Sequence, residues 1–144
     1  ADEPTTALDV TIQAQILDLL LQIQNERHMS LLLITHDLGI VANVADRIAI
    51  MYAGEIVETG STQEIFNNPL HPYTIGLFEA LPRQGTVRER MSTIPGSVPT
   101  ISEEIHGCTF HPRCFKGGDE CLKDAIPLEE ANPLHFVRCV KAGL

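Results

Sequence analysis

The sequence predicts an α/β protein with mainly parallel strands in its first part and a small, loop-rich extension after it. An apolar stripe with helical spacing runs through residues 10–28, and the continuously apolar run 31–34 follows directly. This order is half of a β-α-β unit, and the run is typical of a strand buried on both faces of a parallel sheet. All four cysteines lie in the second half, where Pro and Gly multiply and periodicity fades.

The composition is that of a soluble globular protein. The chain has 144 residues, of which 44% are hydrophobic and 20% charged. Its longest apolar run covers only residues 48–53, whereas a membrane-spanning helix needs about 20 apolar residues. The formal net charge of -9 argues against nucleic acid or an anionic membrane surface as the main partner.

Charge and cysteine content divide the chain into two modules. Residues 1–72 hold ten acidic and two basic side chains, whereas residues 73–144 hold nine acidic and eight basic ones. The chain starts without Met and without a signal peptide, so we expect it to be cut from a longer sequence. Without an export signal a reducing compartment is expected, which favours metal ligation by the cysteines over disulfides.

Elements can be predicted in order along the first module. A helix over residues 10–28 should be capped by Asp9, and a buried strand over 31–34 should pair with another strand that ends near Ala1. Asp37 can cap a short helix that continues to about residue 44.

The following elements are a hairpin and two short helices. Alternation predicts strands over 48–52 and 55–58 around a turn at Ala53 and Gly54. The sequence from Ser61 to Glu64 is a capping box, which opens a helix that ends before residue 69. A further helix is expected over residues 73–81, and the rest of the chain reads as loops.

Three side chains near the first module's predicted strand ends suit nucleotide hydrolysis. Asp2 and Glu3 precede His36 by just over thirty residues, and all three should emerge at carboxyl ends of parallel strands. One carboxylate can hold Mg²⁺ through water, a second can activate an attacking water, and an imidazole can contact a terminal phosphate. Taken alone, the same residues could equally be a strand end and an ordinary histidine near a helix start.

The segment 1–9 resembles the end of the Walker B strand and the D-loop of ABC-transporter ATPases. Residues 33–37 resemble their switch-histidine strand, residues 47–60 look like the hairpin that follows, and the resemblance extends to about residue 68. It implies part of a P-loop NTPase-like domain. The family roles it implies are Mg²⁺ binding through water for Asp2, general base for Glu3, γ-phosphate sensing for His36 and a place in the dimer interface for Asp9.

The sequence also departs from that family in two motifs. It contains neither a G-x-x-x-x-G-K-[ST] loop nor an L-S-G-G-Q signature, which cradle the phosphates and close the site from a second subunit. We therefore expect the chain to be inactive as an ATPase by itself.

The four cysteines have the spacing C-x5-C-x6-C-x17-C and comprise Cys108, Cys114, Cys121 and Cys139. Four thiolates can bind one zinc ion or an iron–sulfur cluster, and the spacing does not choose between them. Disulfides and free thiols remain alternatives. Three neighbouring histidines are further possible ligands: His106, His111 and His135. Nearby basic residues could offset thiolate charge or simply be a solvated surface: Arg113, Lys116, Lys123, Arg138 and Lys141.

Residues 68–74, 81–82 and 95–99 look like the C-terminal extension of oligopeptide/dipeptide importer ATPases. With the cysteines, this resemblance covers residues 69–144 and favours a [4Fe–4S] cluster over zinc, in a structural or regulatory role. It implies ATP and Mg²⁺ as ligands of the complete subunit, and peptides or nickel complexes as cargo. A second ATPase subunit and membrane permeases would be the partners, at the cytoplasmic face of the membrane. The competing hypothesis is a non-catalytic metal-binding interaction module.

Overall fold

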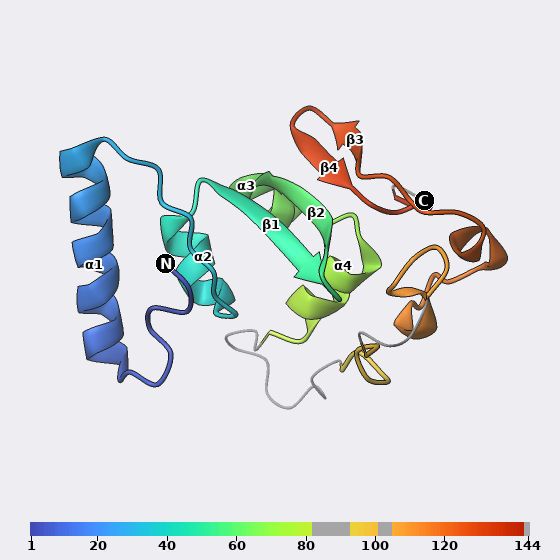
Figure 1. Ribbon diagram of the computed structural model, residues 1–144, viewed down its shortest axis with the longest axis horizontal. Coiled ribbons are helices and arrows are strands. Elements are labelled where there is room, and N and C mark those ends of the chain that lie inside the picture. Colours follow the sequence, from blue (N-terminus) through green and yellow to red (C-terminus); the bar gives the residue numbers. More distant parts are fainter. Residues whose placement is uncertain (82–92, 101–104, 143–144) are drawn as a thin grey trace. The chain divides into compact units, whose positions relative to one another are not determined.

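The computed structural model describes residues 1–81, 93–100 and 105–142, and these form two compact units (Figure 1). The first unit comprises residues 1–45 and the second residues 46–144. The predicted domain limits, 1–68 and 69–144, come from the family resemblance and stay a prediction.

Two capped helices form most of the first unit. Helix α1 (Val10–Arg27) begins where the Asp9 carboxylate accepts hydrogen bonds from two backbone N–H groups, and it ends at His28, whose φ of 52° is left-handed. Helix α2 (Leu38–Val44) is capped in the same way by Asp37. Both predicted caps are confirmed, because a side-chain oxygen satisfies N–H groups that have no partner within the helix.

The buried strand predicted over residues 31–34 is wrong for the described chain. Its only strand pairing there is a single parallel bridge between Asp2 and Ile34, and Leu32 and Ile34 are 78% and 54% exposed. A parallel strand is buried by neighbouring strands and by helices on both faces, and this unit supplies one neighbouring segment. The order of the two segments along the sequence is nevertheless as predicted, and the bridge is parallel.

The second unit contains an antiparallel sheet in the order β1-β2-β4-β3. Strands β1 (Arg47–Tyr52) and β2 (Glu55–Ser61) form the predicted hairpin, whereas β3 (Glu129–Asn132) and β4 (His135–Val137) occupy a segment predicted to be loop. The prediction of mainly parallel strands is therefore wrong for the described residues. Short turns join the strands of both hairpins, and a short turn permits only antiparallel pairing.

Helices α3 (Thr62–Asn67) and α4 (Pro72–Glu79) lie between the hairpin and the cysteine-containing segment along the chain. Ser61 accepts a hydrogen bond from the Glu64 N–H, which confirms the predicted start of α3. Alternate residues of β1 are buried, and the core of this unit combines them with side chains from α3 and the extension: Ile48, Ile50, Tyr52, Val57, Ile65, Phe110, Cys121, Ile126 and Val137.

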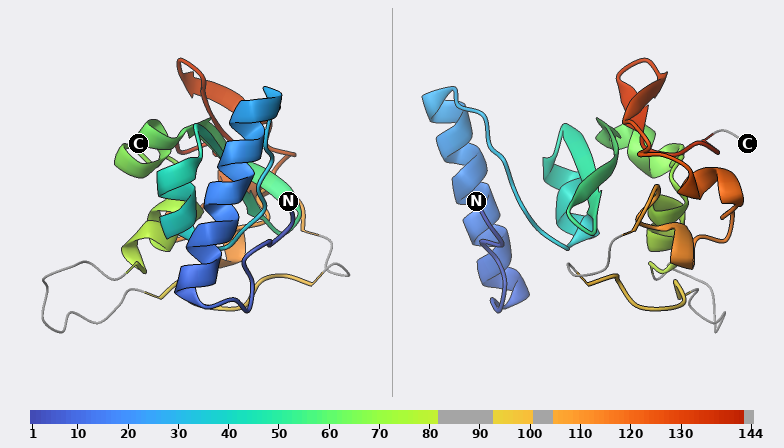
Figure 2. Two further views of the ribbon diagram at one scale, coloured as in Figure 1. Left: turned by 90° about the vertical axis from the view of Figure 1, so that its left-hand side faces the viewer. Right: turned by 45° about the vertical axis from the view of Figure 1, so that its right-hand side comes forward.

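An aromatic cluster fixes the cysteine-containing segment to the hairpin and to α4. In the ribbon, the orange segment near residue 110 runs close to α4 (Figure 2). Phe110 is 1% exposed, and its ring centroid lies 5.1 Å from that of Tyr52 and 5.5 Å from that of Tyr73. Two short 3₁₀ helices follow Phe110, η1 (His111–Arg113) and η2 (Asp119–Leu122). Buried aromatic area of this kind contributes strongly to packing, so the extension is an integral part of the second unit.

Candidate functional site

The first unit brings Glu3 and His36 together. The Glu3 N–H donates to the Ile34 carbonyl over 2.9 Å, which fixes the segment of residues 1–3 beside the segment that leads to His36. The Nδ1 atom of His36 then lies 3.2 Å from Oε1 of Glu3. Two residues that are 33 positions apart in the sequence thus meet at the end of the parallel bridge that includes Asp2, as the strand-end argument predicts.

Local contacts keep the Glu3 carboxylate charged. The Thr6 hydroxyl donates to Oε2 of Glu3 over 2.8 Å, and this hydrogen bond lowers the pKa of Glu3, with His36 lowering it further. The backbone of Glu3 has a left-handed φ of 42°, which few side chains adopt and which turns the chain sharply there. The result is an exposed, ionised carboxylate next to an exposed imidazole, a pair able to accept a proton from water.

Asp9 has a demonstrable structural role. Its Oδ1 accepts from the N–H groups of Thr11 and Ile12, both over 3.0 Å, and so begins α1. A role at a dimer interface stays a prediction, as do the Mg²⁺ role of Asp2 and the catalytic roles of Glu3 and His36.

The four cysteines line one cavity in the second unit. His71, His111, Lys116 and Lys141 line it as well, whereas the other candidate ligands, His106 and His135, do not. All four thiols are free, and the cavity has about 10 Å³ of free space, roughly the volume that one water needs. The structure thus brings together a segment, residues 108–121, and a distant residue, Cys139.

Three of these cysteines share one local conformation. The carbonyls of Cys108, Cys114 and Cys139 each accept a hydrogen bond from the N–H three residues later, over 3.0, 3.1 and 3.3 Å. Each cysteine therefore opens a β-turn. The N–H two residues after each cysteine faces its sulfur and would stabilise a thiolate: the donors belong to Phe110, Lys116 and Lys141.

In the free thiols the surroundings favour the protonated form. Burial raises the pKa of Cys108, Cys114 and Cys139, and the negative charge of neighbouring thiolates raises it further. A bound cation would reverse this balance, since ligation requires thiolates and compensates their charge.

The single-ion alternative receives no support. Among residues 1–81, 93–100 and 105–142, no three His, Cys, Asp or Glu side chains are arranged to hold a metal ion. A four-iron cluster makes a different demand, because each thiolate binds its own iron and the sulfurs need not meet at one point. The sulfur donors and their N–H partners suit such a cluster by chemistry.

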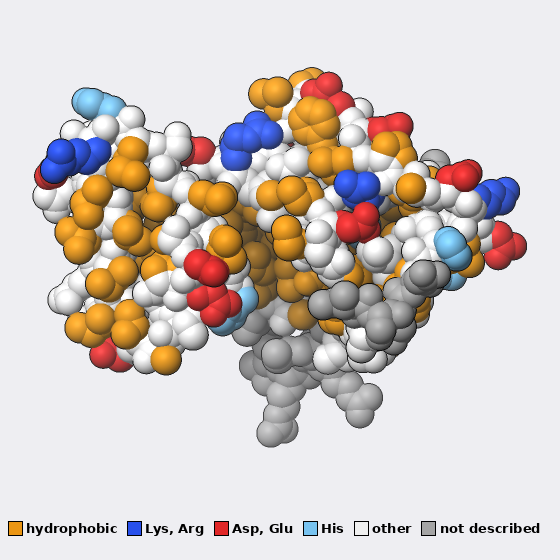
Figure 3. Space-filling view, in the orientation of Figure 1, with side chains coloured by type: hydrophobic (Ala, Val, Ile, Leu, Met, Phe, Trp, Pro, Cys, Tyr) orange, Lys and Arg blue, Asp and Glu red, His pale blue; other side chains and the backbone are white. Residues whose placement is uncertain are grey.

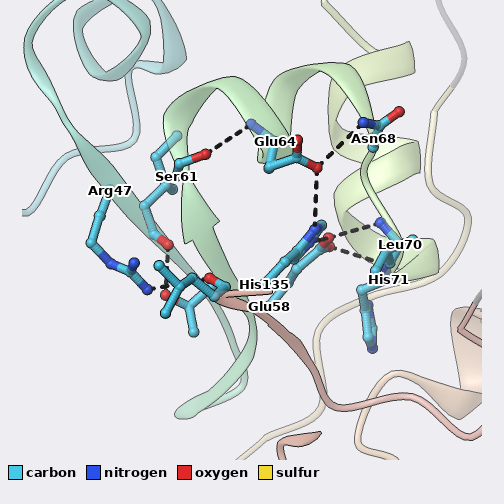
Figure 4. A network of polar contacts seen from close by, with 11 residues as sticks. Arg47, Glu58, Ser61, Glu64, Asn68, Leu70, His71 and His135 are labelled. Atoms are coloured by element: carbon cyan, nitrogen blue, oxygen red, sulfur yellow. Dashed lines mark hydrogen bonds and ion pairs between the residues drawn. The ribbon is translucent and has the colours of Figure 1, made fainter. Parts of the chain in front are cut away.

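The sequence did not indicate a buried network around Glu58 (Figure 4), one member of which, His71, also lines the cysteine cavity. Glu58 is fully buried, and its carboxylate accepts hydrogen bonds from the N–H of Leu70 over 2.8 Å and of His71 over 3.0 Å. Nε2 of His135 lies 2.8 Å from the same carboxylate. The alternation of β2 could have marked Glu58 as facing the core, but nothing in the sequence identifies its partner 77 residues away.

Comparisons with known proteins bear on both sites. Residues 57–121 match the family described as "Oligopeptide/dipeptide transporter, C-terminal region". A Brucella ovis protein named as a peptide import ATP-binding protein is 49% identical over 98% of this chain, and a Brucella abortus protein of the same description is 54% identical over 85% of it. The chain belongs to this importer family. The family predicted from the sequence is therefore confirmed.

The chain spans 44% of the Brucella ovis relative and 37% of the Brucella abortus relative. The family region that residues 57–121 match is described as C-terminal. None of the helices in the described part of the chain is both long and apolar enough to cross a membrane.

Proposed function

We propose that this chain is the C-terminal part of the ATP-hydrolysing subunit of an ABC importer for peptides. The contact between Glu3 and His36 supports the proposal, because it brings a carboxylate and an imidazole together at the end of a parallel bridge. The relatives, named as peptide import ATP-binding proteins, support the same conclusion.

In this proposal each side chain does one step of the chemistry. The Glu3 carboxylate accepts the proton of the water that attacks the γ-phosphate, and the imidazole of His36 holds both that carboxylate and the phosphate. Asp2 would hold Mg²⁺ through water, and the bound ion would supply charge neutralisation for the phosphates. Asp9 positions the loop between Glu3 and α1, and that loop faces the second ATPase subunit.

Exposed apolar side chains indicate where the rest of such a subunit would pack. Within the described residues α1 has no buried residue, and its side chains include exposed Ile12, Leu19 and Ile23. Hydrophobic side chains gather on the visible surface of this unit (Figure 3). Leu32 and Ile34 are exposed as well. We propose that the nucleotide-binding part of the subunit, with its phosphate loop, covers these surfaces, and that the 144-residue chain alone neither binds nor hydrolyses MgATP. The complete subunit would act with permease subunits at the cytoplasmic face of the membrane.

The test is Glu3→Gln in the complete subunit. Loss of a general base reduces turnover by about 10²–10⁴-fold, while ATP binding should change little because the amide is isosteric. Glu26→Gln, an exposed glutamate of α1, is the matched control and should hydrolyse ATP at the normal rate. Normal turnover in the Glu3→Gln subunit would contradict the assignment and favour the non-catalytic alternative.

We propose further that Cys108, Cys114, Cys121 and Cys139 hold a [4Fe–4S] cluster. The shared cavity and the three N–H groups directed at sulfur support this assignment. The cavity must widen to admit the cluster, and β-turns can supply that movement more readily than strands. The cluster would provide cross-linking of the loop-rich extension, since ATP hydrolysis requires no electron transfer.

An anaerobic preparation tests the cluster. We expect iron and sulfide in equal amounts in the 144-residue chain, and loss of both in Cys114→Ser. An iron-free product in which all four thiols react freely would contradict the assignment.

A further inference from the structure

The imidazole of His71 is buried beside the cysteines with one nitrogen unused. His71 is 1% exposed and lines the cavity that the four thiols share. Its Nε2 atom is fully buried and finds no hydrogen-bond partner among the described residues. Buried polar atoms are nearly always paired, so an unpaired one beside a candidate ligand site calls for a partner.

The other ring nitrogen determines which atom carries the proton. Nδ1 of His71 accepts a hydrogen bond from the Tyr73 N–H over 3.0 Å, which caps helix α4. An accepting nitrogen has no proton, so in the neutral ring Nε2 carries it. The unused atom is therefore an N–H donor. Burial also lowers the pKa of His71 to about 4, which keeps the ring neutral at pH 7.

The ring is held so that it cannot turn toward another partner. The His71 backbone N–H donates to Glu58, and its side chain extends away from that carboxylate (Figure 4). Phe110, two residues after Cys108, packs against the ring with centroids 5.7 Å apart. The backbone anchor, the cap and the aromatic contact hold this ring in the lining of the cysteine cavity, and Nε2 is its polar atom without a partner among the described residues.

We propose that Nε2–H of His71 donates a hydrogen bond to a sulfur atom of the iron–sulfur group bound by the four cysteines. This inference rests on the cluster assignment proposed above. His71 is then a positioning and tuning residue: a donor to sulfur stabilises the reduced, more negative state and so raises the reduction potential. The same side chain would cap α4 through Nδ1 and tune the cluster through Nε2.

Two substitutions separate these two roles. In His71→Asn the amide oxygen can still accept from the Tyr73 N–H, but the side chain is too short to replace Nε2. In His71→Gln the amide N–H reaches approximately as far as Nε2, whereas the cap geometry is lost. The anaerobically reconstituted 144-residue chain is titrated for its reduction potential, and iron and sulfide are measured in the same samples.

We expect His71→Asn to make reduction about tenfold less favourable, a shift of about 59 mV to more negative potential for one electron. His71→Gln should stay closer to the wild-type potential. A His71→Asn protein with full iron and an unchanged potential would overturn the inference while leaving the cluster assignment intact. An iron-free wild-type chain would overturn both.

A measurement on the wild-type chain covers the case in which the Asn variant cannot hold iron. The chain is labelled with ¹⁵N-histidine and its reduced cluster is studied by pulsed paramagnetic resonance. We expect a coupled histidine nitrogen and an exchangeable proton. In His71→Gln the histidine nitrogen coupling should be lost with the ring, whereas the exchangeable proton of the amide N–H should remain. If the wild-type spectrum shows neither, the hydrogen bond does not exist.

Discussion

Glu58 holds three parts of the second unit together through one buried carboxylate. It accepts from the backbone of residues 70 and 71, which lead into α4, and it pairs with His135 on β4. Removing these donors would leave a buried carboxylate without partners, and removing the carboxylate would leave buried donors without an acceptor. Either change would lower the free energy of unfolding. The residue therefore acts as a structural junction, close to the cysteine cavity but outside its lining.

We predict that Glu58→Gln lowers the free energy of unfolding by about 3 kcal/mol or more, because one oxygen becomes an N–H₂ group that faces other donors. Glu55→Gln is the matched control on the same strand. Its carboxylate is partly exposed, and Arg138 lies 4.0 Å from it, so the loss should stay under about 1 kcal/mol. Urea unfolding followed by circular dichroism measures both, and equal midpoints for the two variants would contradict the prediction.

Gly107 fits against the backbone next to a second cysteine. Its φ is 76°, and a Cβ placed there would overlap the Cys121 carbonyl oxygen and lie 2.8 Å from Cα of Leu122. The adjacent N–H of Cys108 donates to the same carbonyl over 2.8 Å. This close approach brings the first and third cysteines together, and only glycine permits it.

We predict that Gly107→Ala destabilises the chain by about 1–3 kcal/mol more than Gly54→Ala, because the added methyl group must displace backbone. Gly54 is the matched control: its φ is 83°, and its Cβ would meet nothing within 4 Å. Thermal unfolding of the two variants gives the comparison. If both lose the same stability, left-handed strain alone explains the effect and the close contact does not matter.

At the scale of elements, the Arg113 side chain links the segment of residues 93–100 to strand β1 within the second unit. Its guanidinium donates to the carbonyls of Pro95 over 2.8 Å and Ile94 over 3.1 Å, and to the Tyr52 hydroxyl over 3.3 Å. The planar group can make all three contacts at once, which a lysine ammonium cannot do in that geometry. From the sequence, this side chain could either offset thiolate charge or be solvated; in the structure it is a structural cross-link.

We predict that Arg113→Lys increases amide hydrogen exchange of residues 93–100 by about tenfold, since one to two hydrogen bonds of about 1 kcal/mol each are lost. Arg47→Lys is the control, because the Arg47 side chain makes a single, longer bond of 3.4 Å to Leu134. Mass spectrometry of peptic peptides resolves the segment. Unchanged exchange there would show that Ile94 and Pro95 are held by other contacts.

Local elements were predictable from the sequence because their determinants are local. The caps at Asp9, Asp37 and Ser61 and the hairpin of β1 and β2 depend on residues within a few positions. Strand β4 was missed because it has three residues and pairs with β2, which lies about half the chain length earlier in the sequence. Residues 31–34 were predicted to be buried because their composition is apolar, but burial depends on neighbours that the described residues do not supply.

The same distinction between local and long-range determinants applies to the candidate sites. The meeting of Glu3 with His36 followed from strand order, and the convergence of the cysteines followed from their chemistry. His71 could be recognised in the sequence only as a polar residue before a helix-starting proline, which is a capping signal. Its orientation toward the cysteines depends on Glu58 and Phe110, contacts that no local pattern encodes.

For the whole molecule, the two compact units imply two separate sources of stability. The first unit holds the Glu3 and His36 pair and the capped helices, and the second holds the sheet and all four cysteines. Residues 105–142 contain only short strands and 3₁₀ turns, while ordering a backbone costs roughly 1–2 kcal/mol per residue. A bound metal can supply on the order of 10 kcal/mol, so we expect the cluster to stabilise the second unit selectively.

We predict that removing the cluster from the anaerobic wild-type chain speeds amide exchange across residues 105–142 and leaves α1 unchanged. Cys139 continues directly from β4, so the loss should extend through the pairing of β4 with β2. Helix α1 is the internal control, because its caps come from its own unit. Exchange compared with and without iron gives the result. Equal changes in both units would mean that they unfold as one, and no change in either would mean that the cysteine site adds no stability.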